Sequence, residues 1–244
     1  MEHWEALKDG GYRFVYDDAL FRPGTDTFLL SSLPRLKAGL RVCDLGCGTG
    51  LLGLLLMQRQ AGMAVTGIDI QPDAVALANR CAAENGLEAQ LRFLQADLRT
   101  VRNHFPTGSF DLAICNPPYY SPQSGYMAEG NAIRTARSEV SCTLEDVCAA
   151  AAYLLRWGGS FCLVHKPERL TDVLDSMRRH GCEPKRLRLV CTRPENAPSL
   201  LLIEGRRGGK PGLSIEPPLI LQNSDGSPTA ELDAIYFRQQ EDTP

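Results

Sequence analysis

The chain has 244 residues, of which 43% are hydrophobic and 23% are charged, and its formal net charge at pH 7 is -3. These fractions are ordinary for a globular protein and exclude a collagen-like repeat, a coiled coil and a disordered chain. The length accommodates one large α/β domain with small extensions. Residues 1–10 are polar, and the longest aliphatic run, Leu51–Met57, is too short to span a bilayer, so we expect neither a signal peptide nor a membrane partner.

The nine cysteines are scattered singly, and none forms a CxxC pair. Zinc sites need clustered ligands, so the sequence predicts no metal site. Several thiols lie in apolar stretches, where cysteine behaves as a small hydrophobic residue. Free thiols are typical of a reducing compartment, and we therefore expect a cytoplasmic protein.

In chain order, residues 1–37 carry aromatic side chains in a partly alternating pattern, which predicts a hairpin or cover. From about Leu40 onward, short apolar runs alternate with longer amphipathic ones. We expect strands at Arg41–Leu45, Ala64–Ile70, Leu91–Gln95, Phe110–Cys115, Ser160–His165, Leu187–Val190 and Leu200–Glu204. We expect helices at Gly50–Gln60, Pro72–Asn85, Leu144–Arg156 and Pro167–His180.

This alternation predicts an α/β fold with a doubly wound, mostly parallel, seven-stranded Rossmann-like sheet. We expect residues 1–38 to form an N-terminal cover, 39–206 the main domain and 207–244 a C-terminal appendage. Within that appendage, the Pro, Asn, Ser and Gly residues of 217–228 predict a loop, and 231–238 are expected to return to the main domain. Sheets of this kind bind ligands at the carboxyl ends of their strands.

The first expected strand of the main domain runs into a glycine-rich loop, Asp44-Leu-Gly46-Cys47-Gly48-Thr-Gly50, which a helix follows. Glycines permit positive φ angles and let a ligand approach the backbone closely. The segment Gly48–Gly53 also matches a dinucleotide fingerprint, with Asp69 about 20 residues further on. At this point both NAD and S-adenosylmethionine (SAM) fit the pattern.

Charge favours SAM. The carboxylate of Asp44 opposes a pyrophosphate at the helix start but suits the ammonium and sulfonium groups of SAM. Asp69, at the end of the second strand, is expected to accept hydrogen bonds from the ribose hydroxyls, and Asp97, after the third, from the adenine amino group. A helix cap explains Asp97 equally well. The residues that follow these two acids, Ile70 and Leu98, are expected to line the same pocket.

The fourth strand ends in Asn116-Pro117-Pro118-Tyr119, at the edge where a ligand is expected. An amino group conjugated to a ring is a poor nucleophile because its lone pair is delocalised. The side-chain oxygen of Asn116, also expected beside the cofactor, and the carbonyl of Pro117 can each accept one N–H of such an amine. Pro118 stiffens the loop, and Tyr119 offers a stacking face worth about 1–3 kcal/mol per base. The motif predicts catalysis of methyl transfer to a planar amine.

With these motifs, the chain resembles the class I SAM-dependent amino-methyltransferases. It is most similar to the bacterial tRNA1(Val) (adenine-N6)-methyltransferase family. The resemblance is carried by Pro23–Asp26, Asp44–Gly50, Gly67–Asp69, Asn116–Tyr120, Ala136–Arg137 and His165–Arg169. It implies that Gly24, Thr25 and Asp26 fold over the SAM site, that Arg137 lies near the Asn116–Tyr119 loop, and that tRNA is the partner. Lys166 stands where the family has arginine, which keeps the charge but not the bidentate geometry.

Residues 166–210 hold 11 Lys and Arg against six Asp and Glu, a local charge of +5 against -8 elsewhere. The segment Arg206-Arg207-Gly-Gly-Lys210 is typical of a flexible basic loop, and we expect it to bind tRNA phosphates. A solvated surface explains the charges equally well.

Different acceptors and different functions also fit these motifs. The Asn-Pro-Pro-Tyr motif serves methylation of a glutamine amide in release factors, although those enzymes carry a helical N-terminal domain for which residues 1–37 are too short. Guanine N2 and DNA adenine N6 are chemically similar acceptors. An NAD-binding oxidoreductase and a SAM-binding protein without catalytic activity are two further possibilities. The sequence does not indicate the oligomeric state.

Overall fold

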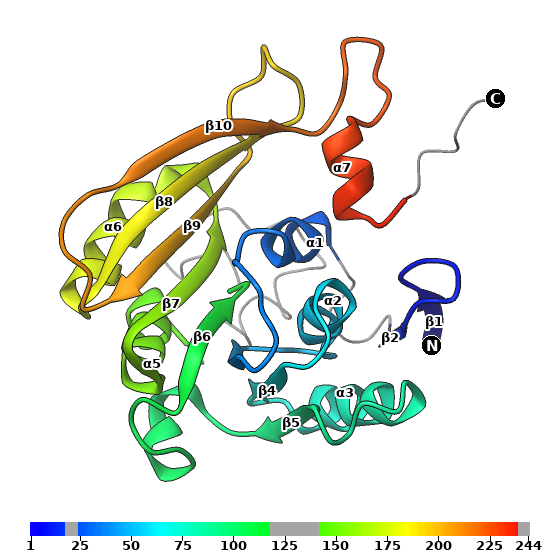
Figure 1. Ribbon diagram of the computed structural model, residues 1–244, viewed down its shortest axis with the longest axis vertical. Helices are drawn as coiled ribbons and strands as arrows, with labels where there is room; N and C mark the ends of the chain where they lie inside the picture. The colour runs from blue at the N-terminus through cyan, green and yellow to red at the C-terminus, as the bar shows by residue number, and fades with distance from the viewer. Residues whose placement is uncertain (18–23, 118–141, 239–244) are drawn as a thin grey trace.

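The computed structural model describes residues 1–17, 24–117 and 142–238, which fold around one eight-stranded sheet (Figure 1). Its strands are β3 (Arg41–Leu45), β4 (Ala64–Asp69), β5 (Leu91–Gln95), β6 (Phe110–Cys115), β7 (Leu155–His165), β8 (Cys182–Cys191), β9 (Leu200–Arg207) and β10 (Ser214–Ile220). The strand order is β10-β8-β9-β7-β6-β3-β4-β5. All neighbours are parallel except that β9 runs antiparallel to β7 and β8. The α/β fold with a mostly parallel sheet is therefore confirmed.

Helices cover both faces of this sheet and bury two hydrophobic cores. One face carries α1 (Thr25–Ser31), α2 (Leu51–Arg59), α3 (Pro72–Glu84) and α7 (Ala230–Ile235). The other carries the 3-10 helix η1 (Leu98–Asn103), α5 (Leu144–Leu154), the short 3-10 turn η2 (Pro167–Arg169) and α6 (Leu170–Arg179). In β6, Leu112 and Ile114 belong to the first core, while Ala113 and Cys115 belong to the second. Because both sides of this part of the strand are buried, Leu112–Cys115 is a continuous apolar run.

The expected count of seven strands was wrong, and so was the loop expected at 217–228 for its first four residues, whereas 221–228 belong to no helix or strand. Strand β10 is an eighth strand, and it contains Pro217 and Pro218. A proline cannot donate to a strand ladder and is tolerated only at edges and bulges. Both conditions hold here, since β10 is the edge strand and its register to β8 shifts between Glu216 and Leu219. Strands β7 and β8 are also longer than expected, and β7 begins at Leu155, inside the expected Leu144–Arg156 helix.

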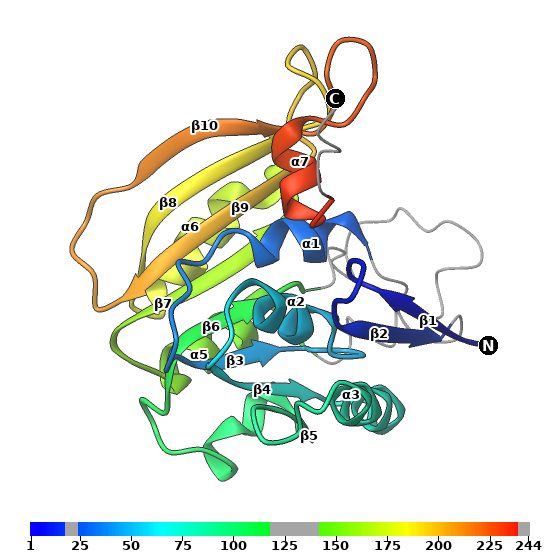
Figure 2. The same ribbon diagram turned by 45° about the vertical axis from the view of Figure 1, so that its right-hand side comes forward.

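The N-terminal segment forms the expected hairpin, made of β1 (Glu2–Ala6) and β2 (Arg13–Asp17). It docks on α3, where Arg80 binds Glu2 through two hydrogen bonds of 2.8 and 2.9 Å and the Arg13 amide donates to Asn85 Oδ1 at 2.8 Å. At the other end of the chain, Figure 2 shows α7 lying over α1. None of the helices in these described ranges has the length and apolar character needed to cross a bilayer.

Candidate functional site

The carboxyl ends of five strands meet at one edge of the sheet, because β7, β6, β3, β4 and β5 are parallel neighbours in that order. The glycine loop follows β3, and Asp69, Asp97, Asn116 and Lys166 end or follow the strands of the same parallel set. The structure brings to this edge Asp44, Gly46, Cys47, Gly48, Gly50, Asp69, Ile70, Asp97, Leu98, Asn116, Pro117 and Lys166. We call it the carboxyl edge.

The glycines of the loop have two different structural roles. Gly46, Gly48 and Gly50 all have left-handed φ angles, of 74°, 53° and 82°. A Cβ atom on Gly46 or Gly48 would meet no atom of the described residues within 4 Å, so these two glycines border space that the described part of the chain leaves open. A Cβ atom on Gly50 would lie 2.5 Å from the ring of Phe93, and one on Gly67 would lie 2.4 Å from it. Gly50 and Gly67, which lies in β4, therefore make room for the Phe93 ring. Gly46 and Gly48 leave the backbone accessible to a ligand.

Asp69 joins the glycine loop to the end of β4. Its Oδ2 accepts from the Gly48 amide at 2.8 Å, and its Oδ1 accepts from the Gln71 amide at 2.9 Å. The side chain is buried with the loop, and both oxygens are held at fixed positions. The next residue, Ile70, has a large apolar side chain that is unusually exposed among the described residues, with 43% of its surface accessible to solvent. A carboxylate and an apolar side chain thus lie side by side at this edge.

Asp44 is only 1% exposed, and its Oδ2 has no hydrogen-bond partner within the described ranges. The backbone amide of Gly53 favours the ionised form of the Asp44 carboxyl and so lowers its pKa. Burial, and then the nearby charge of Asp69, raise the pKa of Asp44 to about 8. An unpartnered buried carboxyl oxygen beside accessible backbone is suited to a cationic ligand group, which would supply the missing partner and favour the ionised form.

Asp97 is the N-cap of η1, as one of the two interpretations of the sequence expected. Its Oδ1 accepts from the Arg99 amide at 2.8 Å, and its carboxylate binds the Arg99 guanidinium at 2.5 to 3.0 Å. These bonds hold the pKa of Asp97 below its ordinary value. Leu98 is buried next to it. The adenine contact of Asp97 stays a prediction.

Asn116 directly follows β6 and is bound to α1. Its Nδ2 donates to Thr27 Oγ1 at 3.0 Å, and Thr27 is only 6% exposed. Gly24 is the N-cap of α1, so the segment Gly24–Asp26 lies within one turn of the residue that contacts Asn116. Pro117 is buried. Thr27 is not among the residues predicted from the sequence, although its place directly before the apolar run Phe28–Leu30 was a signal for a buried polar contact.

His165 ends β7, the neighbour of β6 in the sheet, and Lys166 follows it as the N-cap of η2. His165 is 3% exposed, and its Nδ1 accepts from the Lys166 amide at 2.8 Å, so in the neutral ring Nε2 carries the proton. Burial, and then the charge of Arg169, lower the pKa of His165 to about 4. The ring is therefore neutral near pH 7. Three predicted residues, Pro118, Tyr119 and Arg137, lie outside the described residues.

The basic loop does not reach this edge. Strand β9 runs antiparallel to β7, with Leu201 opposite His165 and Arg206 opposite Ser160. Five strand residues span about 17 Å, so Arg206 lies at the other end of the sheet, which we call the amino edge. Lys210 follows Arg206 away from the site, and Arg207 donates to the His180 carbonyl at 2.8 Å. The substrate residues predicted at 206–210 and those predicted at Asn116 are thus at opposite edges.

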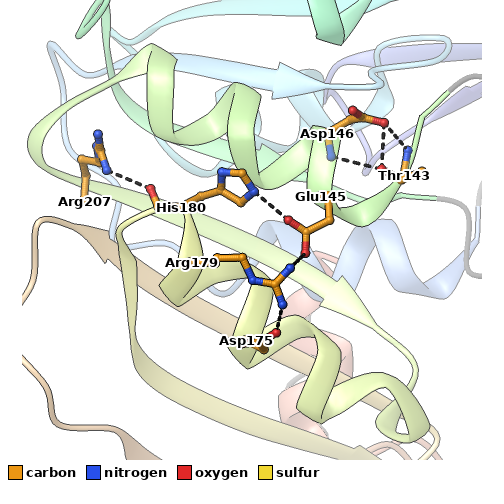
Figure 3. A network of polar contacts seen from close by, with 7 residues as sticks. All are labelled: Thr143, Glu145, Asp146, Asp175, Arg179, His180 and Arg207. Carbon is orange, nitrogen blue, oxygen red and sulfur yellow. Dashed lines mark hydrogen bonds and ion pairs between the residues drawn. The ribbon is translucent and has the colours of Figure 1, made fainter.

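Of the eleven Lys and Arg residues in 166–210, five form ion pairs in the described ranges, among them Arg169 with Asp172. Figure 3 shows Arg179 between Glu145, at 3.0 Å, and Asp175, while His180 Nε2 lies 2.7 Å from Glu145. Three further pairs are Arg178–Glu183, Arg186–Glu204 and Arg188–Glu231. Among residues 1–17, 24–117 and 142–238, Arg206 and Lys210 have no ion pair. The local charge of +5 therefore overstates the free positive charge on this face.

Comparison with known proteins gives a family and a fold. A family model described as "Methyltransferase domain" matches residues 36–179. The tRNA1(Val) (adenine(37)-N6)-methyltransferase of Dickeya chrysanthemi is 29% identical over 86% of this chain and 84% of its own length. The enzyme of that name from Tolumonas auensis is 28% identical over 94% and 98%.

Among solved structures, a predicted O-methyltransferase from Agrobacterium tumefaciens superposes with a TM-score of 0.71 at 22% identity and covers 87% of this chain and 96% of its own. A geranyl diphosphate methyltransferase bound to sinefungin superposes with a TM-score of 0.54 at 19% identity, over 75% and 77%. At these identities the two structures support the fold alone.

Proposed function

This chain belongs to the methyltransferase-domain family and is a SAM-dependent methyltransferase, and we propose that it methylates the N6 amino group of an adenine in tRNA. Support for the acceptor comes from the relatives named as tRNA1(Val) adenine-N6 methyltransferases, which align with most of the chain at 28–29% identity. The single observation that carries the chemistry is Asn116–Pro117 at the carboxyl end of β6, beside the strand that bears the glycine loop.

The described residues fit SAM. We assign the cationic end of the cofactor to Asp44, because its buried Oδ2 has no other partner in the described ranges. Gly46 and Gly48 border the open space that a ligand needs. Asp69 is held by two backbone amides, and a carboxylate has further lone pairs for ribose hydroxyls. Ile70 offers an exposed apolar surface for the adenine ring. When bound, SAM supplies an electrophilic methyl group attached to a sulfonium.

Asn116 and Pro117 bind and orient the acceptor. The Asn116 side-chain oxygen and the Pro117 carbonyl each accept one N–H of the target amine, which turns the nitrogen lone pair away from the plane of the ring. Both acceptors stabilise the positive charge that develops on nitrogen as the new bond forms. A strong base is unnecessary, because the proton then leaves an already cationic nitrogen. The proline fixes the backbone, so little motion has to be frozen.

Tyr119 and Arg137 complete the proposed acceptor site. Tyr119 stacks on the base, and Arg137 contacts the substrate near the Asn116–Tyr119 loop. Pro118 adds rigidity to the same loop. Lys166, at the end of β7, is proposed as a contact to the RNA backbone. We propose no direct role at the reacting atoms for Arg206, Arg207 and Lys210, which lie at the amino edge.

The test is to incubate the protein with methyl-labelled SAM and, separately, total tRNA, genomic DNA and a release factor. We expect label in tRNA only, recovered as N6-methyladenosine after digestion to nucleosides. Label in a release-factor glutamine, in guanine or in DNA would contradict the proposed acceptor. Binding of NADH in place of SAM in calorimetry would contradict the cofactor.

A further inference from the structure

We propose that Thr27 is a positioning residue that holds the Asn116 side-chain amide in place. This inference rests on the proposed function of Asn116 as an acceptor for the target amine. The observation behind it is the hydrogen bond of 3.0 Å from Asn116 Nδ2 to Thr27 Oγ1, which joins residues 89 positions apart in the chain.

The orientation matters because the two ends of an amide have nearly the same shape but opposite hydrogen-bonding roles. The oxygen accepts, whereas the nitrogen donates two hydrogens. With Nδ2 directed at Thr27, the oxygen lies at the other end of the planar amide group and points away from Thr27. A flipped amide would instead present N–H groups to the N–H groups of the acceptor amine, which repels the substrate and removes one acceptor.

The burial of Thr27 makes this choice stable. Its side chain is 6% exposed and Asn116 is partly buried, so water cannot readily replace the hydroxyl if it is removed. By accepting from Asn116 Nδ2, the hydroxyl holds the amide in place before the substrate arrives. Such pre-positioning lowers the cost of binding the transition state.

Contacts distant from Asn116 fix the position of Thr27 itself. Helix α1 has seven residues, too few to be stable alone, so its place is set by packing. Leu29 and Leu30 are fully buried under it. The Phe28 ring stacks on Tyr236 with a centroid distance of 4.3 Å and an interplanar angle of 5°.

Helix α2 holds the other end of α1. Arg59 Nε donates to Ser31 Oγ at 3.0 Å, and Arg59 Nη2 donates to the Ile235 carbonyl at 2.7 Å. One guanidinium thus ties α1 and α7 to the helix that begins at the glycine loop. The tail containing α7 therefore supports the amide orientation indirectly, through α1.

The experiment compares Thr27→Val, which keeps the shape but not the hydroxyl, with Thr27→Ser, which keeps the hydroxyl. We expect Thr27→Val to lower kcat about 10- to 100-fold, with the dissociation constant of SAM unchanged, and Thr27→Ser to stay within about 3-fold of the wild type. Equal losses in both variants, together with a lower Tm, would show that Thr27 is only structural and would overturn the proposal.

If Asn116→Ala keeps wild-type turnover, the proposed function of Asn116 fails; if Asn116→Ala is inactive and Thr27→Val is fully active, only the role of Thr27 fails.

Discussion

The carboxyl edge of the sheet holds two buried carboxylates, Asp44 and Asp69, whereas charged groups near the amino edge, such as Arg206, are exposed. Near the amino edge, Arg179 pairs with Glu145 and Asp175, while Arg206 and Lys210 have no ion pair within the described ranges. At the carboxyl edge, backbone amides hold Asp69 in place, and Asp44 keeps one buried oxygen without a partner in the described part of the chain. Ion pairs satisfy the charges of exposed side chains within the protein. The buried oxygen of Asp44, in contrast, gains a polar partner only when a ligand binds.

This difference shows why a count of charges locates a binding face poorly. The segment 166–210 holds an excess of basic residues, but its carboxylate partners come from outside it as well as from within. Glu145 and Glu231, for example, lie on either side of the segment and neutralise Arg179 and Arg188. If the carboxyl edge is the functional one, changes there should have much larger effects than changes at the amino edge.

The largest effect is expected for Asn116→Ala. The variant loses an acceptor that contacts the amine most strongly when charge develops on nitrogen, so kcat should fall by about 100- to 1,000-fold or more. The dissociation constant of SAM, measured by calorimetry, should stay within a few-fold. The exposed Asn103→Ala is the matched control and should behave as the wild type. Wild-type turnover of Asn116→Ala would remove Asn116 from the mechanism.

A smaller effect is expected for Asp44→Asn, in the binding of SAM. The loss of the carboxylate should weaken binding by about 10-fold or more, because a buried cation then has a neutral partner. In the wild type, affinity should rise with pH up to about 8, since a cationic ligand favours the ionised form of Asp44 and the pKa of Asp44 is about 8 without it. Calorimetry at several pH values measures the SAM affinity of Asp44→Asn and the pH dependence of SAM affinity in the wild type.

The same carboxyl affects stability in the absence of the ligand. The pKa of Asp44 is about 8 in the folded protein and near 3.8 in an unfolded chain, so the folded state binds more protons between these values and stability falls as pH rises through them. The stability of Asp44→Asn should not fall over this pH range. In thermal denaturation the variant should be more stable than the wild type above about pH 8. The exposed Asp73→Asn should retain the fall in stability. A variant less stable than the wild type at high pH would contradict the burial argument.

The smallest effect is expected for neutralising Arg206, Arg207 and Lys210 together. Because they lie at the amino edge, kcat should not change, and KM for tRNA should rise by no more than a few-fold with a weaker dependence on salt. Neutralising Lys8, Arg35 and Lys37, three exposed cations elsewhere, is the control. A collapse of kcat in the first variant but not in the control would show that the loop reaches the reacting atoms.

Much of the carboxyl edge followed from local sequence. The β3–glycine loop–α2 unit was predictable because an apolar strand, three glycines and a helix are adjacent in the chain, and each signal depends only on its neighbours. The ends of β4 and β6 were predictable for the same reason. The segment containing Pro217 was not, because its proline and loop residues resemble a turn until an edge position in the sheet makes them acceptable as β10.

By itself, the sequence determined the order of strands and helices, the glycine loop and the placement of Asp69 and Asn116 at strand ends. Only the tertiary structure decided that Thr27 binds Asn116, that Phe93 occupies the space left by Gly50, and that basic residues such as Arg188 are paired. Such contacts join residues up to 89 positions apart, and their partners are chosen by how strands align and helices pack. Local patterns encode what each segment becomes, whereas packing selects which distant side chains meet.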